Sequence, residues 1–203
     1  MPPSSARWLQ EHFSDDFVKK ARAAGYRSRA VYKLLELHEK NRLFKPGMLI
    51  IELGAAPGSW SQLVVSLVRP RGRVIAIDRL PMDPIEDVEI IEGDFVEPET
   101  VDAILQKIGE TKADWILSDM APNMSGHVSV DIPQAMYLAE LACDFALQTL
   151  NATGGLLMKV FQGEGFDPLL THIRKHFSKV VVRKPQASRG RSREVYIVAM
   201  KLK

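Results

Sequence analysis

The sequence predicts an α/β protein with a seven-stranded, mostly parallel sheet, helices on both faces and an antiparallel last strand. Seven short apolar runs rich in β-branched residues recur along the 203 residues, and helical patterns separate most of them. Such alternation is typical of a parallel sheet covered on both sides. Only the nine residues PQASRGRSR separate the last two runs. This connection is too short for the crossover between parallel strands, so the last strand should run antiparallel.

Each element follows from its local pattern. The helix before the first strand should start at Ser28. The long helix that follows the fourth strand should have Asp131 as its N-cap and Pro133 in its first turn, because these residue types are favoured at these positions. The expected strands are 48–53, 73–78, 88–93, 113–119, 154–161, 179–184 and 194–202, and the expected helices are 28–42, 58–68, 99–108, 131–150 and 167–177.

The bulk properties predict one soluble domain spanning 1–203, of which about 1–45 form a basic, helical extension. No apolar run approaches the roughly 20 residues needed to cross a bilayer, and the N-terminal stretch lacks the apolar core of a targeting signal. The single cysteine, Cys143, excludes a disulfide framework. We expect a cytoplasmic protein, and nothing in the sequence requires more than a monomer.

The net charge of +2 hides two strongly basic segments. Residues 17–35 and 179–193 hold twelve of the 27 basic residues and none of the 25 acidic ones, so the rest of the chain is acidic. One such run is ordinarily a solvated face. Two acid-free runs on an otherwise acidic domain favour a polyanionic partner, and nucleic acid is the most common one. We therefore expect the extension of about 1–45 to bind RNA.

A glycine-rich loop, within IELGAAPGSW (51–60), joins the first strand to the next helix. Ligands bind at this edge of open α/β sheets, but the spacing matches neither the P-loop nor the dinucleotide pattern. Gly54 and Gly58 allow a ligand to approach closely, whereas Pro57 removes an amide donor. The loop therefore favours a nucleoside without phosphates; the alternative is that the two glycines only make a tight turn.

Acidic residues end the next two strands. Asp78 lies 20 residues after Gly58, where a carboxylate can accept from both ribose hydroxyls. Asp94, in EGDF, can accept from an adenine amino group, and Glu52 can meet a charged methionine portion. S-adenosylmethionine has this combination of groups and is the cofactor that we predict.

Three further residues should meet at the same edge of the sheet. Asp119 and Lys159 end the fourth and fifth strands, and Glu194 opens the antiparallel last strand. Beside a methyl donor this set suits an alcohol acceptor, because a lysine with a lowered pKa can act as the base and carboxylates can position it. Lys33 is a candidate second cation, and no metal is required. The alternative for each of these residues, taken alone, is a surface salt bridge, and for Lys33 alone that alternative is favoured.

Longer motifs cover the chain from about Arg7 to Ala199: RSRAVYKL, LFKPGM, ELGAAPGSWSQ, LPMDPI, GDF, SDMAPNMSG, DIPQAMYL, KVFQGEGFD, VRKP and RSREVYIVA. Together they resemble the FtsJ/RrmJ family of ribose 2′-O-methyltransferases. The resemblance implies the Rossmann-like fold of S-adenosylmethionine-dependent methyltransferases. It implies a catalytic tetrad of Lys33, Asp119, Lys159 and Glu194, with Lys159 as the base. It implies cofactor contacts at Gly58, Trp60, Asp78, Asp94 and Asp119.

The resemblance also implies a substrate, namely a uridine 2′-hydroxyl in the A loop of large-subunit (23S) rRNA within the assembled large ribosomal subunit. We expect phosphate contacts from arginines that flank tetrad residues in the sequence: Arg29, Arg189, Arg191 and Arg193. Whether Lys159 is a true base or mainly orients the hydroxyl stays open. So does the choice of target nucleotide, since phosphate contacts carry no base specificity.

Three alternatives compete with this interpretation. A base methyltransferase would need either a thiol near the cleft, and Cys143 lies mid-helix, or an aromatic turn after the fourth strand that DMAP lacks. A non-catalytic RNA-binding or assembly factor would have no use for a lysine at the end of a central strand. A nicotinamide dehydrogenase would need a pyrophosphate loop.

Overall fold

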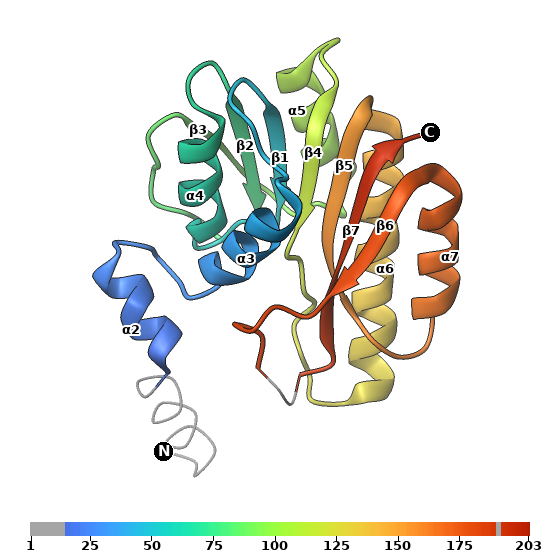
Figure 1. The fold of residues 1–203 in the computed structure, drawn as a ribbon. Coiled ribbons are helices and arrows are strands. Elements are labelled where there is room, and N and C mark those ends of the chain that lie inside the picture. Colours follow the sequence, from blue (N-terminus) through green and yellow to red (C-terminus); the bar gives the residue numbers. More distant parts are fainter. Residues whose placement is uncertain (1–14, 190–191) are drawn as a thin grey trace.

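The computed structural model describes residues 15–189 and 192–203 of the chain (Figure 1). In chain order the described elements are α2 (Asp16–Ala23), α3 (Val31–Asn41), β1 (Leu49–Leu53), α4 (Ser59–Val68), β2 (Arg73–Asp78), β3 (Val88–Glu92), α5 (Pro98–Ile108), β4 (Ala113–Ser118), α6 (Val128–Thr149), β5 (Leu150–Phe161), α7 (Phe166–His176), β6 (Phe177–Arg183) and β7 (Glu194–Leu202). No helix in these described ranges is both long enough and apolar enough to cross a membrane.

The seven strands form one sheet in the order β3-β2-β1-β4-β5-β7-β6. The strands from β3 to β5 are parallel, and β7 lies between β5 and β6, antiparallel to both. The predicted antiparallel last strand is therefore confirmed. Its register pairs Phe161 with Glu194, which brings the first residue of β7 to the carboxyl ends of the parallel strands.

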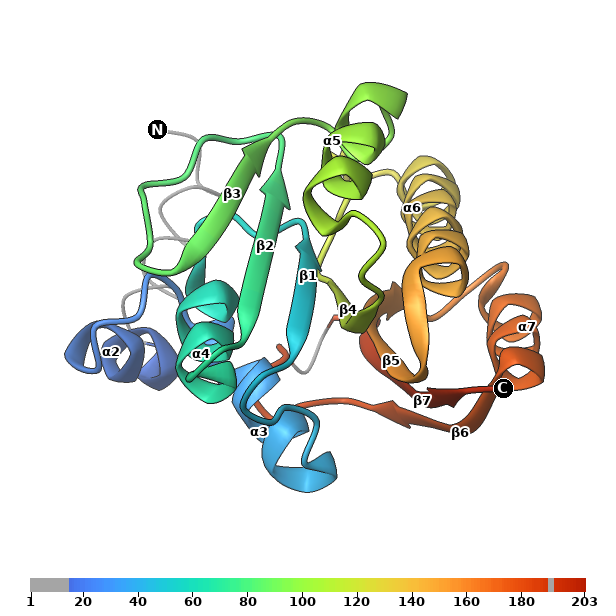
Figure 2. The ribbon, with the colours of Figure 1, turned by 90° about the horizontal axis from the view of Figure 1, so that it is seen from above.

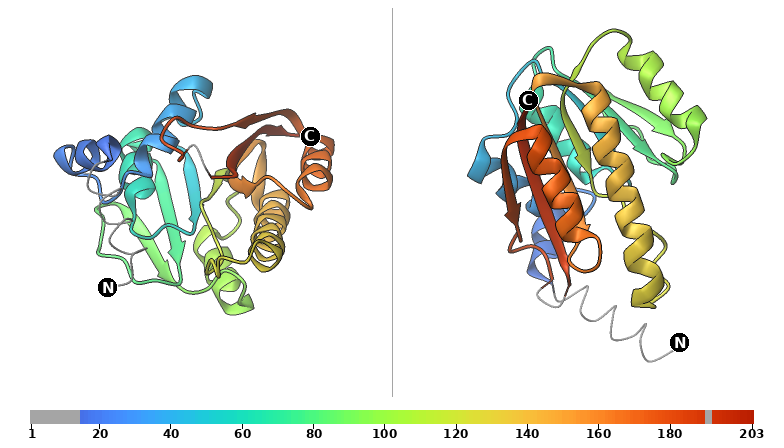
Figure 3. Two further views of the ribbon diagram at one scale, coloured as in Figure 1. Left: turned by 90° about the horizontal axis from the view of Figure 1, so that it is seen from below. Right: turned by 90° about the vertical axis from the view of Figure 1, so that its right-hand side faces the viewer.

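Helices cover both faces of the sheet, as predicted (Figures 2 and 3). Alternate strand residues point to opposite faces. Ile51 and Ile75 lie in the core under α5, α6 and α7, whereas Ile50 and Val74 lie in the core under α3 and α4. The strand order reverses between β1 and β4, and the loops after these strands meet there.

Two helix starts differ from the prediction. α6 begins at Val128, so Asp131 lies in its first turn and is not its N-cap. The buried Asp131 carboxylate instead accepts from the backbone nitrogen and hydroxyl of Ser125, both at 2.8 Å, and from Gly126 N at 3.0 Å. These hydrogen bonds, first of all those from Ser125, lower the pKa of Asp131. The acid that we expected to cap the helix therefore fixes the loop before it.

α3 begins at Val31, three residues after the predicted start. The Ser28 hydroxyl caps the chain locally by accepting from Ala30 N at 3.2 Å and also bonds the Ser59 hydroxyl at 2.8 Å. Residues 24–30, here called the α2–α3 connection, thus contact the start of α4.

Candidate active site

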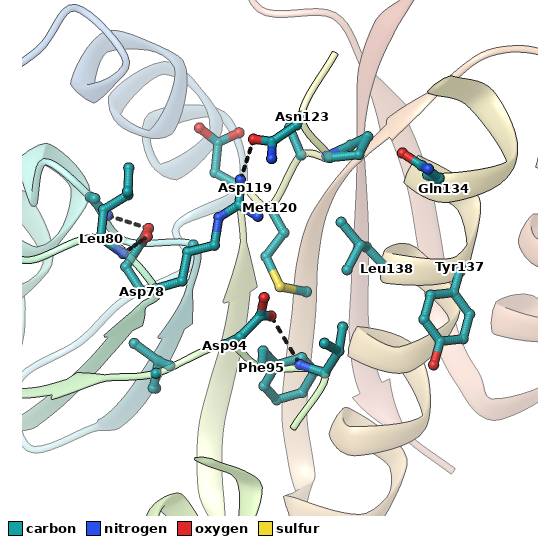
Figure 4. A pocket seen from close by; sticks show the side chains of 18 of the residues that line it. Asp78, Leu80, Asp94, Phe95, Asp119, Met120, Asn123, Gln134, Tyr137 and Leu138 are labelled. Carbon is teal, nitrogen blue, oxygen red and sulfur yellow. Dashed lines mark hydrogen bonds between the residues drawn. The ribbon is translucent and has the colours of Figure 1, made fainter. Parts of the chain in front are cut away.

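A cavity of about 790 Å³ opens at the carboxyl edge of the sheet, over β1, β2, β3 and β4 (Figure 4). The loops that follow these strands form its floor, and the N-terminal half of α6 forms one wall. Four residues that the sequence assigned to the cofactor line this cavity: Gly54, Asp78, Asp94 and Asp119. The fold therefore brings them to one place from four different strands.

Gly54 is required where the loops after β1 and β4 approach each other. Its φ is +76°, and a Cβ at this position would lie 2.8 Å from the backbone nitrogen of Met120. Asp119 N donates to Leu53 O at 3.1 Å across the same gap. A larger residue at position 54 would push Asp119 away from the end of β1, so this glycine has a packing reason beyond ligand access.

The two predicted nucleoside-binding acids have fixed orientations. Asp78 accepts from Ala56 N with one carboxylate oxygen and from Leu80 N with the other, both at 2.8 Å. Asp94 accepts from Val96 N at 3.2 Å. Each carboxylate oxygen can accept a second hydrogen bond. The residues present therefore fit a ribose with two free hydroxyls and a purine amino group.

Gly58 and Trp60 do not line this cavity. Gly58 is the N-cap of α4 with φ +100°, and its neighbours on the side-chain side are Ile85 and Arg27. The Trp60 indole is buried, donates to Ala30 O at 2.8 Å and packs 5.9 Å, centroid to centroid, from the ring of Tyr196. A contact of Gly58 or Trp60 with a cofactor stays a prediction. Their contacts with the α2–α3 connection are present in the structure.

Further hydrogen bonds tie the α2–α3 connection to the glycine-rich loop. The Gln62 side chain accepts from Arg27 N at 2.9 Å and donates to Gly25 O at 3.1 Å. The Arg27 guanidinium donates to Pro57 O at 3.0 Å and to Asp83 O at 2.8 Å. Although it lies in a basic run, Arg27 uses its donors on backbone carbonyls of the glycine-rich loop and of the loop after β2.

The four predicted tetrad residues form two ion pairs. Lys159 Nζ lies 2.6 Å from Asp119 O and 3.1 Å from Asp119 Oδ1. Lys33 Nζ lies 2.6 Å from Glu194 Oε1. All four side chains are largely shielded from solvent, with exposed fractions between 8% and 20%. Each pair is therefore unlike an exposed surface salt bridge.

Tyr196, which the sequence analysis missed, joins the two ion pairs. It is fully buried and is the cross-strand partner of Lys159. Its hydroxyl lies 2.8 Å from Asp119 Oδ1, 3.2 Å from Glu194 Oε1 and 3.2 Å from Lys33 Nζ. A tyrosine inside EVYIVAM is typical of a core residue. Because a buried tyrosine hydroxyl requires a hydrogen-bond partner, the polar residues expected nearby could have indicated its role.

Burial, followed by the charges of Asp119 and Glu194, raises the pKa of Tyr196 well above its usual value. Tyr196 is therefore a neutral hydrogen-bond donor at working pH. It links Lys33, Asp119, Lys159 and Glu194 into what we call the tetrad network.

Replacing Tyr196 with phenylalanine should lower the rate of the chemical step by about tenfold, because one buried hydrogen bond between the carboxylates is lost. The measurement is a single-turnover methyl-transfer rate, with thermal unfolding recorded in parallel. Tyr32→Phe, on α3 and outside the cavity described above, is the matched control. An unchanged rate in Tyr196→Phe would reject a role for the bridging hydroxyl.

Glu52, on β1, is completely buried, and Ser61 Oγ lies 2.5 Å from its Oε2. Burial raises its pKa to about 8. Between its ordinary pKa and about 8 the unfolded chain binds fewer protons at this position than the folded chain, so this group makes stability fall as pH rises through that interval.

Glu52→Gln should therefore stabilise the protein by about 2–4 kcal/mol at pH 8 and have little effect at pH 4.5. Unfolding by urea at both pH values measures the free energy of unfolding of the variant and of the wild type. The contributions of other titrating groups cancel in the difference between the two proteins. A stability difference that is independent of pH would contradict the raised pKa.

The predicted phosphate-binding arginines have different environments. The Arg29 guanidinium is paired with Asp15 and donates to Ala187 O, so it connects α2 with the loop between β6 and β7. Arg189 lines a second cavity of about 440 Å³. Arg193 is exposed, and Arg191 lies outside the described residues. Among residues 15–189 and 192–203 no three His, Cys, Asp or Glu side chains are grouped to hold a metal ion.

A reversed strand order, acids at the ends of β2 and β3 and a shielded lysine–carboxylate network define a methyltransferase of the Rossmann-like class. Solved structures share this fold. A methyltransferase from Streptococcus mutans in complex with SAH is 16% identical, with a TM-score of 0.53, and the match covers 83% of this chain and 97% of that one. This likeness concerns the fold alone.

Nearer relatives narrow the class. A crystal structure of a ribosomal RNA methyltransferase from Plasmodium falciparum is 32% identical, with a TM-score of 0.79, over 87% of this chain and 98% of that one. Ribosomal RNA large subunit methyltransferase E of Cellvibrio japonicus is 58% identical over 195 residues, 96% of this chain and 92% of the relative. The FtsJ-like methyltransferase family matches residues 26–202. The chain belongs to this family and is a methyltransferase.

Proposed function

We propose that this protein transfers the methyl group of S-adenosylmethionine to a ribose 2′-hydroxyl in large-subunit rRNA. The observation that carries the proposal is the tetrad network, which lies beside a cavity suited to a nucleoside. The similarity to the Cellvibrio japonicus protein, which is named for the ribosomal RNA large subunit, supports the choice of substrate.

The larger cavity would hold the cofactor. Asp78 would accept from its ribose hydroxyls and Asp94 from its adenine amino group. Gly54 and Asp119 would lie against its methionine portion, with Gly58 and Trp60 shaping the loop or contacting the cofactor directly. When bound, the cofactor supplies an electrophilic methyl group on a sulfonium.

The tetrad network would align the acceptor. Lys159 Nζ, held by two oxygens of Asp119, either takes the proton of the 2′-hydroxyl or fixes the direction of its lone pair. Glu194, held in place by Lys33, would contact the ribose from the other side. Shielding from solvent strengthens these contacts and excludes water. Alignment of the oxygen with the methyl group then supplies most of the rate enhancement.

The finer assignment rests on the sequence resemblance: a uridine in the A loop, modified within the assembled subunit by a cytoplasmic monomer. The two basic segments, 17–35 and 179–193, support an RNA partner. Arg189, Arg191 and Arg193 would contact phosphates, and Arg29 would brace the loop through Ala187 O. The alternative of cytosine C5 methylation loses its nucleophile, because Cys143 is buried in α6 and burial raises its pKa to about 12.

The test is methyl transfer from labelled S-adenosylmethionine to large ribosomal subunits that lack the modification, followed by alkaline hydrolysis of the RNA. Ribose methylation protects the adjacent phosphodiester, so label in an alkali-resistant dinucleotide is the expected result. Label in mononucleotides would identify a base as the acceptor and overturn the proposal. Absence of label would exclude this RNA as the substrate.

A further inference from the structure

A second cavity, of about 440 Å³, adjoins the tetrad network. One side is formed by residues 28–33, from the α2–α3 connection and the start of α3. The other side is formed by residues between β6 and β7. Its polar lining residues are Ser28, Arg29, Lys33, Arg189, Ser192 and Glu194. Lys33 and Glu194 therefore belong both to this cavity and to the tetrad network.

The cations of this cavity are not equally neutralised. Arg29 is paired with Asp15 and Lys33 with Glu194. Within the described part of the chain, no carboxylate forms an ion pair with Arg189. Burial and the neighbouring charge of Arg189 lower the pKa of Arg29, so the two guanidinium groups repel each other. A bound anion would offset this unfavourable arrangement.

The cavity also keeps hydrogen-bond donors for an anion. Lys33 Nζ has three hydrogens and donates to Glu194 and Tyr196, which leaves one. The Ser192 hydroxyl accepts from Glu194 N at 3.2 Å and retains its own hydrogen. With the planar guanidinium of Arg189, these donors suit the oxygens of a phosphate.

The position of the cavity identifies which phosphate it would receive. Tyr196 Oη connects Lys33 and Glu194 to Asp119, and Asp119 lines the cofactor cavity. The second cavity therefore lies across the tetrad network from the cofactor cavity. In an RNA strand, the carbon that carries the 3′-phosphate is bonded to the one that carries the 2′-hydroxyl. A hydroxyl held at the network places its own 3′-phosphate nearby.

We propose that this cavity binds the 3′-phosphodiester of the nucleotide that is methylated, with Arg189 as the main ion-pair partner. The inference rests on the proposed ribose methylation and assigns separate roles to the arginines. Arg189 fixes the acceptor nucleotide, Arg29 braces the cavity through Asp15 and Ala187 O, and the exposed Arg193 adds affinity for the rest of the RNA. The phosphate thereby orients the ribose, independently of the base.

The kinetic test combines one protein change with one RNA change. Large subunits are assembled from rRNA in which the linkage 3′ to the accepting nucleotide is a neutral methylphosphonate, and single-turnover rates are compared with natural RNA. We expect the methylphosphonate to slow the wild-type protein by about tenfold to a hundredfold, and to have little effect in Arg189→Ala, which is already slow with both RNAs.

Arg193→Ala is the matched control, because it removes the same charge from the same loop outside the cavity. It should weaken binding of both RNAs alike and keep the full methylphosphonate penalty. An equal penalty in wild type and Arg189→Ala would overturn the proposal, as would no penalty in wild type.

A binding measurement separates this inference from the proposed function. The dinucleotide UpU, its methylphosphonate analogue and uridine are titrated into isotopically labelled protein and followed by NMR. UpU should shift the amides of residues 28–30 and 187–189, whereas the neutral analogue and Arg189→Ala should show no such shifts. Equal shifts from UpU and its analogue, or none from either, would overturn the phosphate assignment. If the protein proved not to methylate ribose, the shifts caused by UpU would still be expected, so the two proposals can fail separately.

Discussion

Replacing Lys159 with alanine should reduce the single-turnover rate of methyl transfer by about 10²–10⁴-fold, the range typical of losing a positioned proton-transfer group. Lys159 Nζ contacts two oxygens of Asp119 and has an exposed fraction of 8%. The change removes the amine that the proposed mechanism places against the acceptor hydroxyl. Cofactor affinity should change little, because Lys159 does not line the cofactor cavity.

The pH dependence of that rate separates the two roles left open for Lys159. A general base predicts an ionisation in the wild-type profile that disappears in Lys159→Ala, whereas a purely orienting lysine predicts profiles of the same shape. Lys201→Ala, an exposed lysine on β7, is the control and should retain the wild-type rate. Full activity in Lys159→Ala would exclude it from the chemistry.

Replacing Asp78 with alanine should weaken S-adenosylmethionine binding by at least about a hundredfold. Two charge-assisted hydrogen bonds to ribose hydroxyls would be lost, each worth about 1.5–3 kcal/mol. The backbone nitrogens of Ala56 and Leu80 would also lose the acceptor that orients both loops. Calorimetric titration measures the dissociation constant, and circular dichroism checks that the variant is folded.

Glu92→Ala provides a matched control for Asp78→Ala. Glu92 is the register partner of Asp78 on β3, but it is exposed and does not line the cofactor cavity. Its removal takes away the same charge at the same height of the sheet. We expect Glu92→Ala to bind the cofactor as the wild type does. Equal losses in the two variants would mean that general electrostatics, and not ribose contacts, cause the effect.

The sheet was predictable because its strands follow from local sequence patterns and the direction of its last strand follows from the length of one connection. Apolar β-branched runs located all seven strands, and the nine-residue connection before Glu194 fixed the direction of β7. The position of β7 between β5 and β6 was not predictable in this way, since it depends on which edges pair in space. Helix starts failed where polar side chains have partners other than the helix end: Asp131 accepts from Ser125, six residues earlier, and Ser28 bonds Ser59, 31 residues later.

The candidate site was predictable where residues end strands. Asp78, Asp94, Asp119 and Lys159 project from one edge of the sheet, and antiparallel pairing brings Glu194 to the same edge. Tyr196 escaped notice because its ring lies in the core while its hydroxyl alone reaches the tetrad network. The backbone carbonyls that engage Arg27 belong to loops 30 and 56 residues away, and charge patterning carries no information about such contacts.

The contacts of the α2–α3 connection determine whether the N-terminal residues can be deleted without disturbing the rest of the protein. A basic N-terminal extension suggests a removable RNA-binding appendage that could be deleted or grafted. Deleting residues up to 30 would leave the buried Trp60 indole without its acceptor at Ala30 O and the Gln62 side chain without Gly25 and Arg27. The glycine-rich loop would also lose the Arg27 contact at Pro57 O. Residues 24–30 and the glycine-rich loop are therefore one architectural unit, and neither is a modular part.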